Sequence, residues 1–449
     1  MTRNARLEIL VVSNLWPPHF VGGYELGASE VASHLAARGH RVTVLTSMFG
    51  ELGPTIDGNV HRVLFSLIRR RNLGPRQLLA ESVSSARAGR RVRRLLRSTR
   101  FDIVYLFSPV GLNSALLEQL TTTGRSVVAY VSDDWVSQWP RCDRLFEKWM
   151  RPRPYPWTDG NRVLVLARWA LRRAGVFACN PEVPIRHAQF VSRYVRGISI
   201  GRLPLLASEM IIPWGIDIGR YPFRARMPGE LRNWILVGQV EAHKGVQTAV
   251  DAVALLRSQG EPVTMTIYGS DTTAFARALR ERVARSGLAS HVRFAGARPR
   301  EQLPGEAYHR GGLFLLPSVW KEPFSITLLE AFASGIPVLA TSTGGTGEIV
   351  RDGETATVFE AEDAAHLAAQ YQNLLRHPAR ASVMASRARR IVEEYLDIEA
   401  MVDRVESHLL AVRDGCAAGS SGADSPRLHP WEDANMRVLD SPVSHNRER

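Results

Sequence analysis

Short apolar runs alternate with helical patterns along most of the chain, and this alternation limits the possible folds more than any other feature. The first half has strand patterns at 7–13, 41–47, 102–108, 126–132 and 176–179, with helical patterns at 25–37, from residue 112, at 161–173 and through Phe190. The second half has strand patterns at 233–240, 263–269, 291–296, 313–318, 337–342 and 355–359. Such alternation is typical of parallel sheets covered by helices. We therefore predict an α/β protein with two Rossmann-like parallel-sheet domains that face each other across a cleft.

The two series of strands also suggest where the domains begin and end. A chain of 449 residues suits two domains of roughly 200 residues each. A passage rich in proline and glycine, IIPWGIDIGRYPF, separates the two series. We expect an N-terminal domain at 1–205, a linker at 206–220, a C-terminal domain at 221–390, a helix at 391–414 that packs back on the N-terminal domain, and a disordered tail at 415–449.

The composition argues against several other classes of protein. No stretch approaches the roughly 18 apolar residues of a membrane-spanning helix, and the apolar run near the start is too short for a signal sequence. The cysteines, Cys142, Cys179 and Cys416, are odd in number and lack the spacing of metal ligands. We therefore expect a cytoplasmic protein with no disulfide framework and no metal site.

The net charge of +13 is concentrated in one stretch. Residues 69–100 contain eleven arginines and a single acid, Glu81, interleaved with leucines and valines. One interpretation is a basic amphipathic helix that contacts an anionic membrane surface; the other is a solvated helix face, and we weigh the two equally. We expect no nucleic-acid partner, because no helix-turn-helix, zinc or aromatic stacking pattern accompanies the charge.

The segment SVWKEPFSITLLEAFASGIPV, residues 318–338, carries the sharpest signal of function. Pro323 favours the first turn of a helix, which places Glu322 just before that helix and Glu330 about two turns inside it. The amides of Phe324, Ser325 and Ile326 would then be free donors for an anion or for sugar hydroxyls. For an isolated Glu-Pro pair, the better interpretation would be an acid that complements the helix dipole.

The full string resembles the E-x7-E motif of retaining glycosyltransferases of family 4. Four other segments are similar to motifs of that family, in the same order along the chain: VGGYE at 21–25, IPWGID at 212–217, GQVEAHKG at 238–245 and TGGTGEIV at 343–350. Each segment alone is weak, because glycine pairs after strands usually serve turns. Five in the expected order over most of the chain make a chance match improbable.

The resemblance implies a GT-B fold and a metal-independent transferase that moves a sugar from a nucleotide-diphosphate sugar, without another cofactor, to a glycan, lipid-linked or small-molecule acceptor. Lys244 would neutralise the diphosphate, Glu322 would hold the donor sugar, and Glu330 would hold the ribose hydroxyls. Retaining members react on one face of the sugar and need no protein nucleophile. The implied donor-binding residues are Gly22, Gly23, Gly238, Gln239, Lys244, Arg298, Phe324, Ser325, Ile326 and Glu330.

The chain departs from the family pattern at two positions. Gln239 stands where the family has an arginine on the diphosphate, a loss of about 1.5–3 kcal/mol that Arg298 or Arg300 could offset. Ser132 stands where many relatives have a histidine near the reacting sugar. Asp133 or Asp134 would then carry its polar contacts, and both are candidate catalytic residues with Glu322 and Lys244; the alternative is that they cap the following loop. The second functional hypothesis is therefore a catalytically silent protein that binds a nucleotide sugar or a partner.

Overall fold

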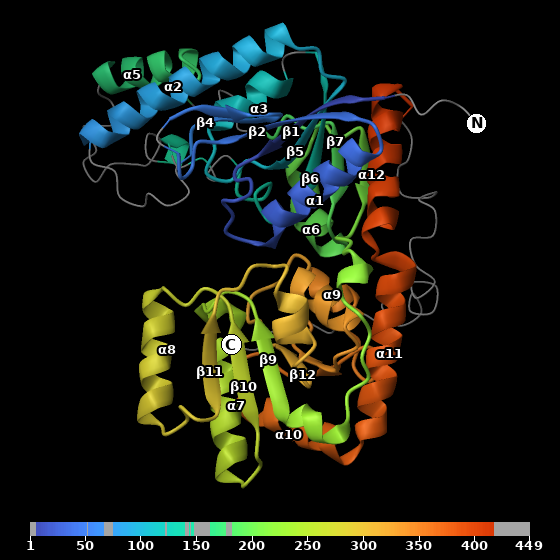
Figure 1. The fold of residues 1–449 in the computed structure, drawn as a ribbon. Helices are drawn as coiled ribbons and strands as arrows, with labels where there is room; N and C mark the ends of the chain where they lie inside the picture. Colours follow the sequence, from blue (N-terminus) through green and yellow to red (C-terminus); the bar gives the residue numbers. More distant parts are fainter. Residues whose placement is uncertain are drawn as a thin grey trace, which may run out of the picture.

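The computed structural model describes residues 6–51, 53–66, 75–121, 124–139, 143, 145–147, 162–176 and 182–416. They form two α/β domains, one above the other in Figure 1, each built on its own sheet. All but the first residue of the strand predicted at 176–179 lies outside the described residues, as does the predicted tail beyond residue 416.

The N-terminal sheet has eight strands in the order β3-β4-β2-β1-β5-β6-β7-β8. Their bounds are β1 Glu8–Ser13, β2 Arg41–Ser47, β3 Thr55–Asp57, β4 Val60–Leu64, β5 Ile103–Ser108, β6 Ser126–Val131, β7 His187–Phe190 and β8 Ser208–Ile211. Neighbouring strands are parallel except β3 and β4, which form an antiparallel hairpin. Every residue of the central strand β5 is buried, because helices cover both faces of a parallel sheet.

The helices of the N-terminal domain are α1 Gly23–Ala37, α2 Pro75–Ser98, α3 Ser114–Thr121, α5 Arg162–Arg173 and α6 Arg193–Ser199. Helix α1 begins directly after the Gly-Gly loop, where the side chain of Glu25 accepts the N–H of Gly22 at 2.9 Å. Figure 1 shows α2 and α5 along the side of this domain that lies away from the C-terminal domain.

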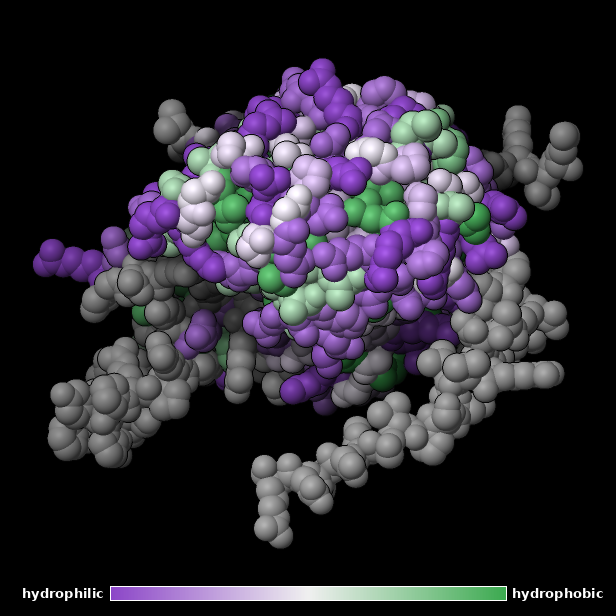
Figure 2. Space-filling view, turned by 90° about the horizontal axis from the view of Figure 1, so that it is seen from below, coloured by the Kyte–Doolittle hydropathy of each residue, from purple (hydrophilic) through white to green (hydrophobic). Residues whose placement is uncertain are grey.

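The C-terminal sheet is parallel throughout, with six strands in the order β11-β10-β9-β12-β13-β14. The strands are β9 Asn233–Val237, β10 Thr264–Tyr268, β11 Val292–Gly296, β12 Leu313–Leu316, β13 Val338–Ala340 and β14 Thr357–Val358. The helices are α7 Val246–Ser258, α8 Ala274–Arg285, α9 Ile326–Ala333, α10 Ala364–Arg376, α11 Pro378–Tyr395 and α12 Ile398–Arg413. The face of the molecule seen in Figure 2 is mainly hydrophilic, with scattered hydrophobic patches.

The structure corrects the sequence analysis at three places in the N-terminal half. The helix predicted through Phe190 is wrong, because His187–Phe190 forms strand β7 between β6 and β8. Strand β8, Ser208–Ile211, extends the N-terminal sheet into the segment 206–220, where we expected a linker. The hairpin of β3 and β4 was not predicted, and all three residues of β3 are exposed.

The last helix returns to the N-terminal domain. Helix α12 packs against α1 and β6, beside the N-terminal sheet in Figure 1. Its Glu406 contacts both Arg38, at 2.9 Å from the guanidinium, and the imidazole of His40, at 2.9 Å. The two segments that connect the domains pair with each other. Ile216 of the first segment exchanges backbone hydrogen bonds with Leu396 and Ile398 of the second, at 3.0 and 3.1 Å. The two crossings therefore support each other.

We predict that Gly215→Ala destabilises this crossing. A Cβ atom at Gly215 would lie 2.6 Å from the carbonyl oxygen of Asp397, closer than real Cβ contacts come. Because backbone rather than a flexible side chain would have to move, the free energy of unfolding should fall by about 1–3 kcal/mol. Urea unfolding measures the change, with Gly229→Ala as the control because no atom lies within 4 Å of its Cβ. Equal stability of the two variants would contradict the prediction.

Candidate active site

The predicted donor motifs meet at one edge of the C-terminal sheet. Lys244 lies in the loop after β9, Glu322 in the loop after β12, and the glycine-rich segment 343–350 follows β13. These three strands are neighbours in the order β9-β12-β13, so the loops at their carboxyl ends converge. Ligands of open parallel sheets bind beyond this edge. Figure 1 shows α9, which follows the Glu322 loop, on the side of the C-terminal domain next to the N-terminal domain.

Lys244 and Glu322 form an ion pair, which the sequence analysis did not foresee. The Lys244 Nζ atom lies 2.7 Å from Glu322 Oε1, and the same oxygen accepts the hydroxyl of Ser318 at 2.6 Å. The Glu322 side chain is 6% exposed and the Lys244 side chain 24%. The Nζ atom also lies 5.0 Å from the centre of the Trp320 ring, at cation–π distance. Lys244 is therefore held beside the first glutamate of the motif, and part of its side chain stays exposed to solvent.

Gly245 explains why the lysine loop can approach so closely. Its φ of 66° is left-handed, and an added Cβ would lie 1.7 Å from the carbonyl oxygen of Pro317. Only glycine fits both conditions. The loop is fixed further by a backbone hydrogen bond of 2.9 Å from the N–H of Val319 to the carbonyl of His243. Burial, with the charge of Lys244 second, lowers the pKa of His243, so this neighbouring ring is neutral at physiological pH.

Glu330 lies inside α9, as predicted, and both oxygens of its carboxylate already accept hydrogen bonds. Its side chain accepts the hydroxyl of Tyr221 at 2.7 Å on Oε1 and the hydroxyl of Tyr308 at 2.6 Å on Oε2. Arg300 Nε also donates to Oε1, at 3.3 Å. The other end of Arg300 reaches across to Glu30 of α1, with Nη1 2.9 Å from Oε2. Arg300 therefore links the second glutamate of the motif to the N-terminal domain.

The start of α9 differs from the prediction. The helix begins at Ile326, three residues after Pro323, and Ser325 is its N-cap, with the hydroxyl accepting the N–H of Leu328 at 3.3 Å. The hydroxyl of Ser325 thereby satisfies one of the free amides at the start of the helix. Phe324 and Ser325 therefore precede the helix, and Phe324 is buried in the core.

The loops that carry Gly22 and Gly238 contact each other across the two domains. Gln239 donates its side-chain amide to the carbonyl of Val21 at 2.6 Å, so it faces the N-terminal loop instead of standing free for a phosphate. A Cβ on Gly23 would lie 3.0 Å from Ile326 at the start of α9. Gly238 has a φ of 156° and donates its N–H to Tyr268 at 2.9 Å. The structure thus places the Gly-Gly loop beside the donor motifs.

Of the two arginines considered as replacements for the missing cation, Arg300 is the one at the site. Arg298 pairs with Glu306, at 3.0 Å, and with its own loop, and has no described contact with Lys244, Glu322 or Glu330. The sequence analysis missed Tyr221, Tyr308 and Glu30. They come from distant parts of the chain and form no motif with Glu330.

The acceptor-side candidates lie after β6. Asp133 accepts the N–H of Trp135 at 3.0 Å, which is the loop-capping role considered above, while Asp134 is exposed. Burial raises the pKa of Asp133 to about 7; the hydrogen bond from Trp135 opposes this and the charges of Asp134 and Glu25 add to it.

Glu25 is a further candidate that the sequence analysis quoted only as part of the VGGYE segment. It is fully buried, burial raises its pKa, and its Oε1 atom has no hydrogen-bond partner. The hydroxyl of Ser132, which stands in the place of the family's histidine, is also buried without a partner. Trp135 and Trp139 are core residues, with 1% and 4% exposure. Among the described residues, no cluster of three or more His, Cys, Asp and Glu side chains could hold a metal ion.

Two family models match the chain, one on each domain. The model described as "Glycosyltransferase Family 4" matches residues 21–183, and the model described as "Glycosyl transferases group 1" matches residues 219–391. Together they cover well over half of the chain.

The chain belongs to glycosyltransferase family 4. The predicted family and its glycosyltransferase activity with a nucleotide-sugar donor are thereby confirmed.

Two named relatives match this family 4 chain over different lengths. Glycogen synthase of Mycobacterium tuberculosis is 27% identical over 436 residues, which cover 91% of this chain and 96% of that protein. The GDP-mannose-dependent alpha-(1-6)-phosphatidylinositol monomannoside mannosyltransferase of Mycolicibacterium smegmatis is 31% identical over 241 residues, which cover 50% of this chain and 60% of that protein.

Solved structures confirm the predicted GT-B fold. Sucrose-phosphate synthase from Thermosynechococcus elongatus superposes with a TM-score of 0.67 at 18% identity, covering 91% of this chain and all of that one. Anabaena HepE in complex with UDP-glucose gives a TM-score of 0.61 at 18% identity, covering 90% of this chain and 100% of that one. At this identity the likeness speaks for the fold alone.

We predict that Arg300→Met lowers the free energy of unfolding by about 3 kcal/mol, because it leaves the buried carboxylate of Glu330 without its cation and leaves Glu30 with Arg220 alone, at 3.6 Å. Glu30→Gln in the Arg300→Met background should recover part of this loss, since a carboxylate that has lost its nearer cation is then replaced by a neutral amide. Urea unfolding of the two single variants and the double variant gives the coupling energy. Strictly additive effects would show that Arg300 and Glu30 do not interact in solution.

We also predict a pH-dependent stabilisation by Asp133→Asn. The raised pKa means that the native state keeps a proton which the unfolded state loses above its ordinary pKa of about 3.9. Between that value and about pH 7, the wild-type protein therefore loses stability as the pH rises, whereas the asparagine variant does not. Melting temperatures from pH 4 to pH 8 should diverge in favour of the variant. Asp57→Asn, on an exposed strand, is the control and should track the wild type.

Proposed function

We propose that the protein is a retaining, metal-independent glycosyltransferase that moves a sugar from a nucleotide-diphosphate sugar to a glycan, lipid-linked or small-molecule acceptor. The observation that carries this proposal is the ion pair of Lys244 and Glu322, which puts the family's cation and its first glutamate 2.7 Å apart at the carboxyl edge of the sheet. On donor binding, each side chain would leave the other: Lys244 would bind the diphosphate and Glu322 would bind the sugar.

The donor would replace each half of this pair by a better partner. A diphosphate carries two negative charges, and more charge gathers on the leaving phosphate as the glycosidic bond breaks. Lys244 would turn to that phosphate, because its ammonium is a compact charge on a flexible stem and is 24% exposed. Glu322 would then accept hydroxyls of the donor sugar, while Ser318 keeps one carboxylate oxygen in place. Positive charge at the leaving group comes from the protein in this scheme.

On the acceptor side, Asp133 would be partly protonated near neutral pH, because burial raises its pKa to about 7, and burial also raises the pKa of Glu25. A protonated carboxyl can donate a hydrogen bond to the acceptor, and this suits a reaction in which the leaving phosphate helps to deprotonate the attacking hydroxyl. No protein nucleophile is required, in keeping with the retaining mechanism that the family resemblance implies.

The relatives indicate donors and acceptors of this class. The mannosyltransferase is named for GDP-mannose and for a phosphatidylinositol acceptor, glycogen synthase is named for a glucan, and HepE was solved with UDP-glucose. We extend to this chain a nucleotide-activated hexose as the donor. A glycan and a lipid-linked sugar are the acceptors that these names support.

We place the enzyme in the cytoplasm, on the inner face of the membrane. The support is the arginine run at 69–100, which would contact acidic lipid head groups. No helix among the described residues is long and apolar enough to cross a bilayer.

A second candidate function is a catalytically silent protein that binds a nucleotide sugar or a partner. It is favoured by Glu330, whose two oxygens are occupied by Tyr221, Tyr308 and Arg300, and by Ser132 in the place of the family's histidine. Turnover separates the two candidates, since only the enzyme releases nucleotide in the presence of an acceptor.

We predict that one of UDP-, GDP-, ADP- or TDP-sugar stabilises the purified protein against heat and is slowly hydrolysed. Lys244→Ala and Glu322→Ala should each reduce nucleotide release at least 100-fold, because loss of one electrostatic contact to the transition state costs about 2.7–4 kcal/mol. Thermal shift and a nucleotide-release assay measure binding and turnover.

Lys321→Ala is the matched control, since Lys321 is an exposed lysine in the same motif. It should retain binding and release. Binding without release for any acceptor would select the silent protein, and an equal loss in all three variants would disprove the assigned roles.

A further inference from the structure

Two helices of the N-terminal domain expose large apolar side chains beside arginines. Val165, Leu166 and Trp169 of α5 are 53%, 63% and 57% exposed, and Leu79 and Val83 of α2 are 58% and 42% exposed. Five of the 14 exposed large apolar side chains among the described residues thus lie on this helix pair. Isolated exposed apolar residues need no explanation, but a group of them on adjacent helices marks an interaction surface.

Helix α2 presents one continuous outer face. Its exposed residues recur at helical spacing, with apolar side chains toward the start and arginines toward the end: Leu79, Val83, Arg87, Arg90, Arg94 and Arg97. The one acid of this helix, Glu81, is 9% exposed and points elsewhere. The outer face is therefore apolar and cationic, without a carboxylate.

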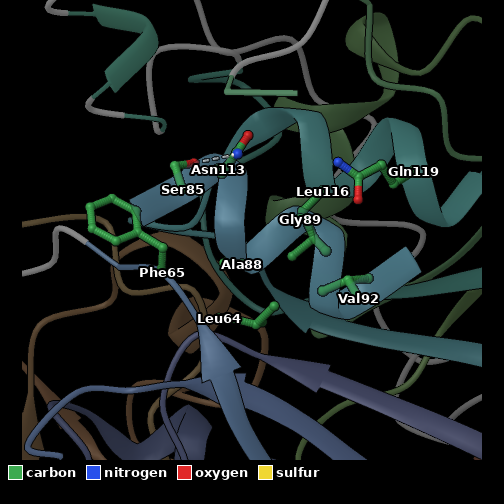
Figure 3. Close-up of a pocket in the computed structure, with 9 residues that line it drawn as sticks. All are labelled: Leu64, Phe65, Ser85, Ala88, Gly89, Val92, Asn113, Leu116 and Gln119. Atoms are coloured by element: carbon green, nitrogen blue, oxygen red, sulfur yellow. Dashed lines mark hydrogen bonds between the residues drawn. The ribbon is translucent and has the colours of Figure 1, made fainter. Parts of the chain in front are cut away.

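The two helices are anchored to the same part of the domain. Asn113 at the start of α3 donates to the hydroxyl of Ser85 in α2, at 2.5 Å, and to the carbonyl of Gly175 just after α5, at 2.8 Å. Figure 3 shows Asn113 and Ser85 facing each other beside a small cavity beneath α2. A small apolar cluster that includes Leu78 of α2 and Leu171 of α5 joins the helices further. Both helices are thus fixed to the same part of the domain.

We propose that α2 and α5 form a docking surface for an anionic lipid bilayer. Val165, Leu166 and Trp169 would enter the boundary between head groups and acyl chains, where tryptophan is favoured. Arg87, Arg90 and Arg94 would contact the phosphates, each contributing attraction to an anionic surface. The guanidinium of Arg173, 4.9 Å from the centre of the Trp169 ring, would extend from the inserted ring back toward the head groups.

The charge and the exposed apolar side chains favour a bilayer as the partner. The outer face of α2 carries exposed arginines and no exposed carboxylate, and α5 adds exposed apolar side chains, a combination that suits anionic head groups above acyl chains. The surface lies on α2 and α5, away from the C-terminal domain in Figure 1, so docking would leave the donor loops free. The inference deepens the membrane placement given under the proposed function, but its observations do not depend on sugar transfer. It also favours the lipid-linked acceptor, and that step rests on the proposed activity.

The test is binding of the full-length protein to vesicles of phosphatidylcholine, alone and mixed with phosphatidylglycerol. We expect flotation with the anionic vesicles only. The triple variant Arg87→Gln, Arg90→Gln, Arg94→Gln should bind about 100-fold more weakly. The control triple variant Arg285→Gln, Arg387→Gln, Arg390→Gln removes the same charge from exposed positions on α8 and α11 and should stay within threefold of the wild type.

Insertion is tested separately through Trp169. The wild-type fluorescence should shift to shorter wavelength on binding. Trp169→Phe should still bind, but its spectrum should shift less. The difference between the wild-type and variant spectra gives the part of the shift that comes from Trp169. Trp169→Gln should bind at least tenfold more weakly. Thermal unfolding should be the same for all variants, because the changed residues are exposed.

Four results would overturn the proposal: equal binding to neutral and anionic vesicles, equal weakening by the two triple variants, tighter binding to RNA than to vesicles at the same salt concentration, or a dimer by light scattering that Trp169→Gln dissociates. Sugar transfer is not used as a readout. A protein that binds vesicles but transfers no sugar would refute the proposed function and leave the docking surface standing.

Discussion

The ion pair of Lys244 and Glu322 is the contact on which the candidate site depends. It joins two loops that are 78 residues apart in sequence and adjacent only because β9 and β12 are neighbours in the parallel sheet. Gly245 is required for that approach, since a side chain there would collide with the backbone at Pro317. Moving either loop would separate the cation from the acid, so the sheet order, the left-handed glycine and the placement of charge form one constraint.

The two domains are coupled at the site and at the helical return. Near the site, Arg300 joins Glu330 to Glu30 of α1. At the other end, α12 packs on α1, so this helix is held by the C-terminal half on two sides. Both chain crossings between the domains run through the paired segments around Ile216 and Leu396. Any rotation of one domain against the other must therefore bend this crossing and alter the contact of Arg300.

The sequence was sufficient to predict the parts of the structure that depend on local pattern. Long apolar runs such as 233–240 predicted the C-terminal strands, and the resemblance to family 4 predicted that Lys244 and Glu322 belong to one site. Strand β7 was mistaken for helix because its four residues, HAQF, are too short to show a period and are held by pairing on both sides. The partners of Glu330 could not be predicted, since Tyr221 and Tyr308 meet it only through the packing of distant segments.

The partners of Glu330, the second glutamate of the motif, add a free-energy cost to ligand binding there, and the motif alone does not reveal this cost. Oε1 of Glu330 accepts two hydrogen bonds and Oε2 accepts one, so a ribose hydroxyl that binds at Oε1 competes with Tyr221 or Arg300. The tyrosine hydroxyls lie at 2.7 and 2.6 Å, whereas Arg300 lies at 3.3 Å and has a second carboxylate to hold it. Arg300 is thus the partner that costs least to displace. Because it also ties the C-terminal half to α1, recognition of the nucleotide and contact between the domains draw on the same side chain.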